Sequence, residues 1–107
     1  MPSDEHVMES SVFDYERQCR YSENFGFKRY LKALYKGEIV EAKRNGLGVM
    51  IYEQGTRLYE GQWRGDQRNG HGYERYKNDN TYLGDFQNNK PEGKGVYTWK
   101  NGEVYDG

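Results

Sequence analysis

The sequence predicts an all-β protein: an elongated, single-layer antiparallel sheet of stacked β-hairpins, preceded by a short helical or irregular N-terminal cap. Three observations support this fold class. Glycines and aromatic residues recur at a fixed interval over two-thirds of the chain, which is typical of repeat architectures. Within each repeat the glycines and aromatic residues are two or four positions apart, which places them on the same face of a strand. Only 34% of the 107 residues are hydrophobic, yet 11 are tyrosine, so any core must be built largely from rings.

The repeat interval is 23 residues. Tyr59-Glu60-Gly61 recurs as Tyr82-Leu83-Gly84 and as Tyr105-Asp106-Gly107, and an earlier unit precedes the first of these by 24 residues. We therefore divide residues 35–107 into units 35–58, 59–81 and 82–104, followed by an incomplete unit 105–107. The repeated positions, which we expect to shape the sheet, are Tyr35, Gly37, Gly46, Gly48, Tyr52, Tyr59, Gly61, Trp63, Gly70, Gly72, Tyr76, Tyr82, Gly84, Phe86, Gly93, Gly95, Trp99, Tyr105 and Gly107.

Glycine weakens a strand interior, so its regular presence beside aromatic residues needs a reason. Because side chains alternate along a strand, Tyr59, Gly61 and Trp63 share one face. A backbone without a Cβ atom lets a ring lie directly over the neighbouring strand. The sequence therefore predicts that glycines act as sockets for rings. The glycines expected under rings are Gly61, Gly72, Gly84 and Gly95.

The segments "YEGQWRGDQRNGHGYERYKNDNT" and "YLGDFQNNKPEGKGVYTWKNGEV" closely resemble the MORN repeat (membrane occupation and recognition nexus). The resemblance covers residues 35–107 and implies stacked antiparallel hairpins in one twisted sheet. Two positions depart from the family pattern. The mid-turn Gly65 is replaced by Glu41 in the first unit and by Asn88 in the last, and Ile39 stands where later units have an aromatic residue. The first unit therefore resembles a degenerate cap.

The N-terminal third divides into two parts. Residues 1–12 are expected to form an acidic, mobile tail, and residues 13–34 a cap or docking segment. Phe27, Tyr30, Leu31 and Leu34 follow helical spacing, which favours a short helix or an irregular cap. A rival interpretation is a degenerate half-repeat, because Gly26 precedes Tyr30 by four residues, as in the repeat units.

The first unit also carries an apolar patch on the face opposite the rings, where later units are polar. Such a patch needs a cover, and a terminal repeat needs a cap. The patch residues are Val40, Leu47, Val49 and Ile51, and the expected covering residues are Phe25, Phe27, Tyr30, Leu31 and Leu34.

The sequence predicts no enzyme, no cofactor and no metal site. His6 and His71 are the only histidines, and no Cys or His pair has metal-site spacing. The single Cys19 is interpreted as a structural thiol and favours a reducing compartment. The Gly-x-Gly pairs lack the rest of any phosphate-binding motif. An expected flat ribbon also offers no concave pocket with paired acids.

The charge distribution limits the classes of partner. The net charge is −1, so nucleic acid is not expected as a partner. Residues 17–36 contain six basic side chains and one acidic, but residues 1–16 contain five acids that compete for them. We therefore expect at most a weak contact with anionic phospholipid. A solvated basic face is the favoured interpretation.

The expected function is a non-catalytic scaffold or adaptor that binds protein subunits of a larger complex. The resemblance suggests a cytoplasmic, cytoskeleton-associated location, with a cilium or axoneme and a radial-spoke-like assembly favoured by analogy. The alternatives are a phospholipid or membrane-contact module, and a targeting segment of a larger enzyme.

The last three residues begin a further unit. An edge strand is rarely left bare in natural proteins. We expect, in this order, that the chain continues, that a partner strand pairs with the edge, or that two copies join their ends.

Overall fold

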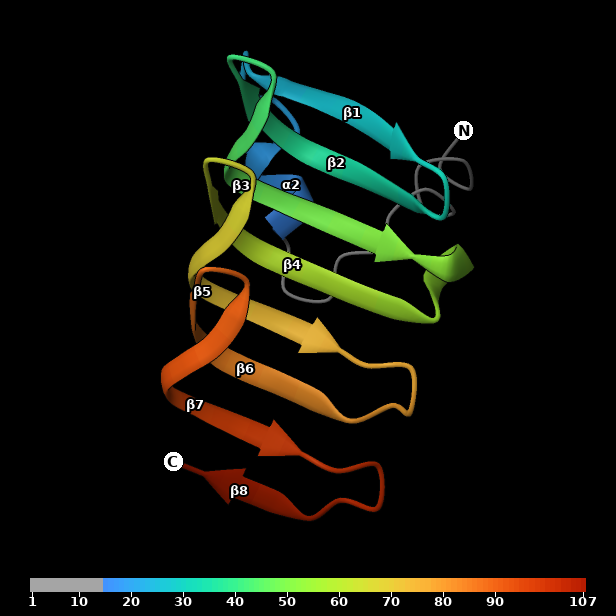
Figure 1. Cartoon of the computed structure of the whole chain (residues 1–107), viewed down its shortest axis with the longest axis vertical. Helices are drawn as coiled ribbons and strands as arrows, with labels where there is room; N and C mark the ends of the chain where they lie inside the picture. Colours follow the sequence, from blue (N-terminus) through green and yellow to red (C-terminus); the bar gives the residue numbers. More distant parts are fainter. Residues whose placement is uncertain (1–14) are drawn as a thin grey trace.

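The computed structural model describes residues 15–107, so the expected acidic tail at 1–12 lies outside the described residues. A single eight-stranded sheet has its strands in sequence order, and every neighbouring pair is antiparallel (Figure 1). This confirms the predicted fold class. The elements are α2 (Tyr15–Cys19), β1 (Phe25–Tyr30), β2 (Ala33–Val40), β3 (Lys43–Tyr52), the 3-10 turn η1 (Glu53–Gly55), β4 (Arg57–Arg64), β5 (Gln67–Arg75), β6 (Thr81–Gln87), β7 (Lys90–Thr98) and β8 (Val104–Asp106).

Two-residue turns join the strands of each repeat unit. Glu41-Ala42 joins β2 to β3, Gly65-Asp66 joins β4 to β5, and Asn88-Asn89 joins β6 to β7. All six residues have positive φ, between 52° and 71°. Turns with two positive φ angles match the right-handed twist of the flanking strands, and they favour Asn, Asp and Gly. Glu41 and Ala42 therefore occupy a conformation that costs them free energy.

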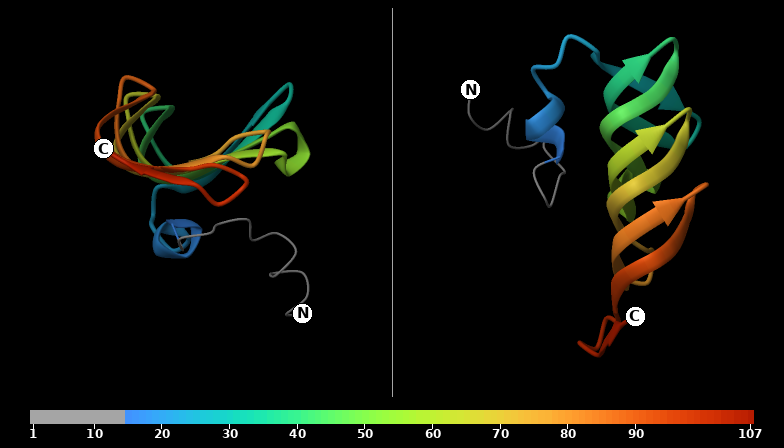
Figure 2. Two further views of the ribbon diagram at one scale, coloured as in Figure 1. Left: turned by 90° about the horizontal axis from the view of Figure 1, so that it is seen from below. Right: turned by 90° about the vertical axis from the view of Figure 1, so that its left-hand side faces the viewer.

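A row of glycines crosses the sheet. Gly26, Gly37, Gly48, Gly61, Gly72, Gly84 and Gly95 each pair with the next one in register. The register shifts just after this row in β2, β4 and β6. Such irregularities bend a strand and increase its twist. The expectation of a flat ribbon is therefore wrong: the sheet bends into a trough, as the end-on view in Figure 2 shows.

The prediction of a helix from Phe27 to Leu34 is also wrong. Residues 25–30 form β1, as the rival interpretation of a half-repeat anticipated, and the one α-helix of the described residues is α2 at 15–19. The physical reason is the edge of β2. A helix at 27–34 would leave the backbone donors and acceptors of β2 unpaired, whereas β1 pairs with them and extends the glycine row through Gly26.

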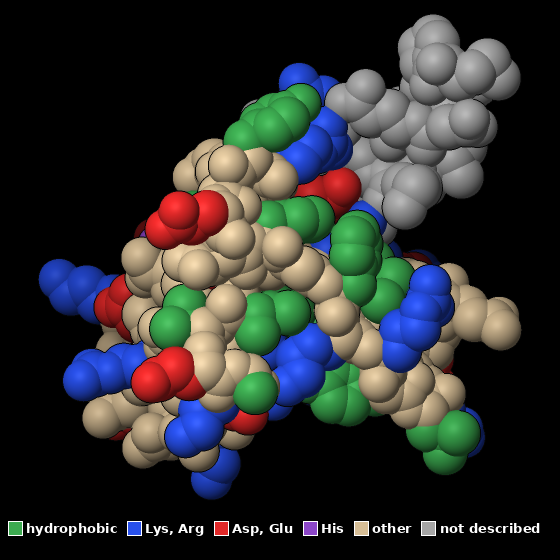
Figure 3. Space-filling view, turned by 90° about the horizontal axis from the view of Figure 1, so that it is seen from above, with side chains coloured by type: hydrophobic (Ala, Val, Ile, Leu, Met, Phe, Trp, Pro, Cys, Tyr) green, Lys and Arg blue, Asp and Glu red, His purple; other side chains and the backbone are tan. Residues whose placement is uncertain are grey.

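The two faces of the sheet have different contents. α2 lies on the convex side of the trough and packs against β2, β3 and β4 (Figure 2). The aromatic core lies on the concave side, where Figure 3 shows hydrophobic and basic side chains gathered in the hollow. The core consists of Tyr35, Met50, Tyr59, Trp63, Tyr82 and Phe86. Its rings meet edge to face, with centroids 5.0–5.4 Å apart.

Candidate interaction surface

Each repeat unit seats one buried tyrosine over glycines of the next strand. Tyr59 lies against Gly72 so closely that a Cβ atom at that glycine would overlap the ring and its hydroxyl. Tyr35 and Gly48, and Tyr82 and Gly95, have the same relation. These are the sockets that the sequence predicts. At Gly61 and Gly84 an added Cβ would also meet the backbone of the next strand.

The hydroxyl of each seated tyrosine is anchored. Tyr35, Tyr59 and Tyr82 donate to the carbonyl oxygen three residues further on, at 2.9, 2.9 and 3.1 Å. Burial raises the pKa of Tyr35 and Tyr59 well above the ordinary value, so both phenols stay protonated donors. The rings are therefore held as structural parts, with no ionisable role near neutral pH.

A second set of glycines serves another purpose. Gly46, Gly70 and Gly93 have positive φ, and an added Cβ would meet the side chains of Glu38, Gln62 and Asp85, respectively. Glu38 accepts a hydrogen bond from the Leu47 backbone N–H at 2.8 Å, and Gln62 accepts one from His71 at 2.6 Å. Sequence reasoning missed this contact. Its signal is a polar residue directly after the first glycine of each unit.

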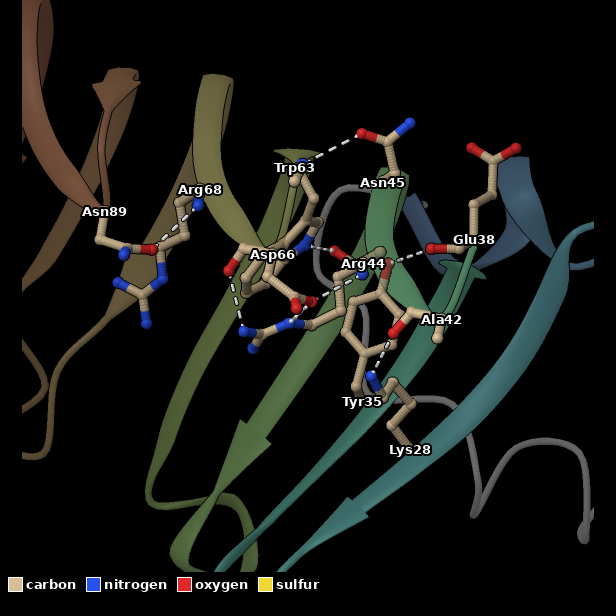
Figure 4. A network of polar contacts seen from close by, with 12 residues as sticks. Lys28, Tyr35, Glu38, Ala42, Arg44, Asn45, Trp63, Asp66, Arg68 and Asn89 are labelled. Carbon is tan, nitrogen blue, oxygen red and sulfur yellow. Dashed lines mark hydrogen bonds and ion pairs between the residues drawn. The ribbon is translucent and has the colours of Figure 1, made fainter. Parts of the chain in front are cut away.

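Arginines line the concave trough, which sequence reasoning also missed. The Arg44 guanidinium lies over Trp63 at 4.7 Å, and Asp66 accepts from it at 3.0 Å (Figure 4). The Arg44 backbone N–H also donates to the Asp66 carboxylate at 2.8 Å, and these contacts lower the pKa of Asp66. The signal was present in the repeat, because Arg44 and Arg68 are 24 residues apart.

Arg68 occupies the corresponding place in the second unit. Its guanidinium lies over Tyr59 at 4.7 Å and donates to the Tyr52 hydroxyl at 2.6 Å. Glu74, only 2% exposed, accepts from Arg68 and from Arg57, each at 2.8 Å. The charges in this part of the trough are thus paired with one another, which suits a structural role better than a catalytic one.

The C-terminal end of the trough is different. A groove of about 590 Å³ is lined by aromatic residues, Pro91 and Glu92. The rings of Tyr76 and Tyr97 stack at 6.0 Å, and Tyr97 meets Trp99 at 4.8 Å. Trp99 is 40% exposed and Tyr105 62% exposed. Large aromatic residues with exposed surface are typical of interaction sites.

The convex patch of the first unit is covered by α2. Val49 is buried together with Cys19 of α2, whereas Leu47 and Ile51 are half-buried and Val40 is exposed near its hairpin end. A buried ion pair anchors the helix: Glu16 and Lys36 approach to 2.9 Å.

The predicted covering residues do not provide this cover. Phe25, Phe27 and Leu34 lie on the convex face and extend the apolar surface, since Phe27 pairs with Lys36 and Leu34 with Ile51. Tyr30 lies on the concave side against Arg44, and Leu31 is fully exposed in the turn. The expectation that these residues form the cover is therefore wrong. A helix can lie across the face of the sheet and cover the patch. The side chains of the neighbouring strand β1 project from that same face, so they stand beside the patch side chains and do not lie over them.

Residues 15–107 contain neither a cluster of metal-ligating side chains nor a membrane-spanning helix. No group of three or more His, Cys, Asp or Glu side chains in this range could hold a metal ion. None of the helices in the described part of the chain is long and apolar enough to cross a membrane. His71 is exposed and lies 3.7 Å from Asp85, while His6 is outside the described residues.

Comparison with known proteins agrees with the repeat geometry. A family model described as MORN repeat matches residues 35–57, 59–81 and 82–104. The chain is 32% identical over 84 residues to alsin from mouse and to alsin from human. Each match covers 74% of this chain but 5% of alsin, so the chain spans about one-twentieth of the length of these relatives.

Proposed function

Because the chain belongs to the MORN-repeat family, we propose that it is a non-catalytic scaffold or adaptor that binds protein partners within a larger assembly. The observation that carries the proposal is the aromatic groove at the C-terminal end of the trough. The rings of Tyr76, Tyr97 and Trp99 pack against one another, yet Trp99 and Tyr105 keep a large exposed area. Rigid rings bind with little loss of side-chain entropy.

The rest of the trough supports this choice of surface. In the first two units arginines occupy the hollow and are paired with carboxylates: Arg44 donates to Asp66, and Arg68 donates to Glu74. In the third unit several rings line an open groove. A partner would therefore engage the C-terminal end and leave the N-terminal units to hold the shape.

The proposed setting is cytoplasmic and cytoskeletal, with a cilium or axoneme as the first place to look. This part rests on family analogy. Fluorescent tagging of the chain in ciliated cells tests it, and a uniform distribution that ignores cilia and filaments would contradict it.

A partner-capture experiment tests the binding surface. Proximity labelling in the source cell would compare the natural chain with a Trp99→Ala and Tyr105→Ala double variant. A Tyr21→Ala variant is the matched control, because Tyr21 is also a highly exposed tyrosine but lies near α2. We expect the double variant to lose a defined set of partners that the control keeps. Identical partner sets for all three chains would refute the groove as the binding surface.

A membrane-contact role and a targeting role in a larger enzyme are the second and third proposals. Several cations are engaged within the protein and therefore less available to lipid: Lys36 and Arg20 contact Glu16, and Arg68 contacts Glu74. The small share of alsin that is matched agrees with a repeat segment acting as one part of a long chain. The protein-binding role ranks first because its surface is exposed.

A further inference from the structure

The three repeat units differ at one position of the trough. Arg44, Arg68 and Pro91 stand at equivalent places, each paired in register with the large apolar residue of the preceding strand, namely Ile39, Trp63 and Phe86. In the first two units this place supplies a guanidinium that lies on aromatic rings. In the third unit proline supplies no cation.

The rings that receive the guanidinium are nevertheless kept in the third unit. Arg68 lies over Tyr59 and Tyr52, and these residues correspond to Tyr82 and Tyr76. Tyr82 and Tyr76 line the open groove together with Pro91. Comparison of the second and third units therefore shows that the groove lies where the second unit places its arginine side chain, and that the third unit has no arginine there.

We propose that this groove binds the guanidinium group of an arginine side chain presented by a protein partner. The proposal rests on the protein-binding function above and names the chemistry of its ligand. A planar guanidinium stacks on aromatic faces and is more weakly hydrated than an ammonium, so it is preferred over lysine in such a site. Glu92, an exposed carboxylate that lines the same groove, complements its charge.

A second replacement explains why the cation comes from outside. The buried Glu74 that neutralises Arg68 corresponds to Tyr97 in the third unit, so both members of the internal ion pair are gone. A permanently buried arginine without this carboxylate would carry the full desolvation cost of its charge. A partner's arginine at the groove mouth keeps part of its hydration and dissociates again.

Nuclear magnetic resonance titration of the whole chain tests the proposal. The probes are three blocked tripeptides, acetyl-Gly-X-Gly-amide, with X as arginine, lysine or citrulline, the neutral isostere of arginine. We expect saturable shifts of the Trp99 indole signal with the arginine peptide in the millimolar range. The citrulline peptide should bind at least about tenfold more weakly. Trp63 is an internal control, because it is buried and its indole N–H donates to Gly48.

Two variants at one position sharpen the test. Pro91→Arg supplies the guanidinium in cis, as in the second unit, and should abolish binding of the arginine peptide. Pro91→Ala removes the ring without adding charge and should retain it. An unchanged Trp63 signal reports that each variant is folded. Equal binding of citrulline and arginine, unchanged affinity of Pro91→Arg, or no saturable shift at Trp99 would each overturn the proposal.

The outcome separates this proposal from the function on which it rests. If the partners that depend on Trp99 and Tyr105 are still captured by Pro91→Arg, the scaffold function stands and the guanidinium site is refuted as their contact. If the arginine peptide binds but the double variant loses no partner, the site stands as a ligand site and the proposed scaffold surface fails.

Discussion

At the scale of single residues, close packing between rings and bare backbone holds the trough together. Gly72 and Tyr59 are the clearest case, because the ring and its hydroxyl fill the space that a Cβ atom would need. The Tyr59 hydroxyl is fixed in turn by the Gln62 carbonyl, so the ring has no easy way to retreat. Small changes at such a glycine should therefore have large effects on stability.

Gly72→Ala tests this packing. Gly72 has no positive φ, so the backbone accepts alanine and the effect is steric. We expect the free energy of unfolding to fall by about 1 kcal/mol or more, measured by urea denaturation. Gly26→Ala is the matched control, since its Cβ would meet only the flexible end of Ile39 at 3.1 Å and should cost less. Equal stability of Gly72→Ala and the natural chain would contradict the socket interpretation.

The thiol of Cys19 gives a pH dependence. Burial is the main cause that raises its pKa from 9.0 to about 11. Above pH 9 the unfolded thiol loses its proton while the folded thiol keeps it. The contribution of this thiol to the free energy of unfolding should therefore be fully present below pH 9. It should fall between pH 9 and 11, by up to about 1.4 kcal/mol per pH unit. The difference between the natural chain and Cys19→Ala in urea denaturation isolates this effect. A difference that is constant from pH 8 to 10.5 would contradict it.

At the scale of elements, the turns and the helix contribute in opposite ways. The turn at Glu41-Ala42 places two side-chain-bearing residues at φ of 52° and 64°. The α2 helix instead gains its position from tertiary contacts, since five residues are too few for an independent helix. The turn thus lowers the stability of the fold locally, whereas α2 is stable only through its contacts with the sheet.

Relieving the turn should stabilise the protein. In Glu41→Asn with Ala42→Gly, the new residues match those favoured at positive φ. We expect a gain of about 1 kcal/mol, which raises the melting temperature by about 4–8 °C for a domain of this size. Calorimetry measures it. The same pair of residues introduced at Gly65-Asp66 should change little, because that turn already has suitable residues, and equal gains at both turns would point to a nonspecific effect.

Removing the charge of Glu16 should loosen α2. Glu16 and Lys36 are 6% and 3% exposed at their side chains, so neutralising Glu16 removes a charge–charge contact from a buried site. We expect Glu16→Gln to lower the free energy of unfolding by about 3 kcal/mol. Glu23→Gln, at an exposed position nearby, is the control and should be neutral. The idea fails if both variants melt at the same temperature.

At the scale of the whole molecule, the bend of the sheet separates two surfaces. The concave side holds paired arginines and rings, and the convex side carries α2. The basic segment at 17–36 is dispersed in part: among its six basic side chains, Lys36 is buried in an ion pair, Arg20 contacts Glu16, and Lys28 donates to the Ala42 carbonyl. No broad cationic face results from these three side chains.

This dispersion predicts weak binding to membranes. Co-sedimentation with phosphatidylserine-containing vesicles should be detectable only at low salt. It should vanish by physiological ionic strength, where charges are screened over about 8 Å. Phosphatidylcholine vesicles are the control. Tight, salt-resistant binding to one phosphoinositide would reverse the order of the proposals and place the membrane-contact role first.

Local pattern determined much of this protein. The 23-residue spacing of Tyr59, Tyr82 and Tyr105, and the glycines beside them, predicted the sheet, its repeat and the rings over bare backbone. These features depend on residues that are neighbours along one strand or one hairpin, so alternation along the chain reveals them.

The tertiary structure alone decided the rest. The sequence has helical spacing at Phe27, Tyr30, Leu31 and Leu34, yet residues 25–30 form a strand that pairs with β2. Hydrogen bonds along the edge of a sheet outweigh a weak local preference for helix. The bend arose where the register shifts of β2, β4 and β6 line up across the sheet. That bend brings Arg68 onto Tyr59. In the third unit Pro91 occupies the position equivalent to Arg68, and Tyr76 and Tyr82 line an open groove. Such relations join residues on different strands, and only the assembled sheet places them together.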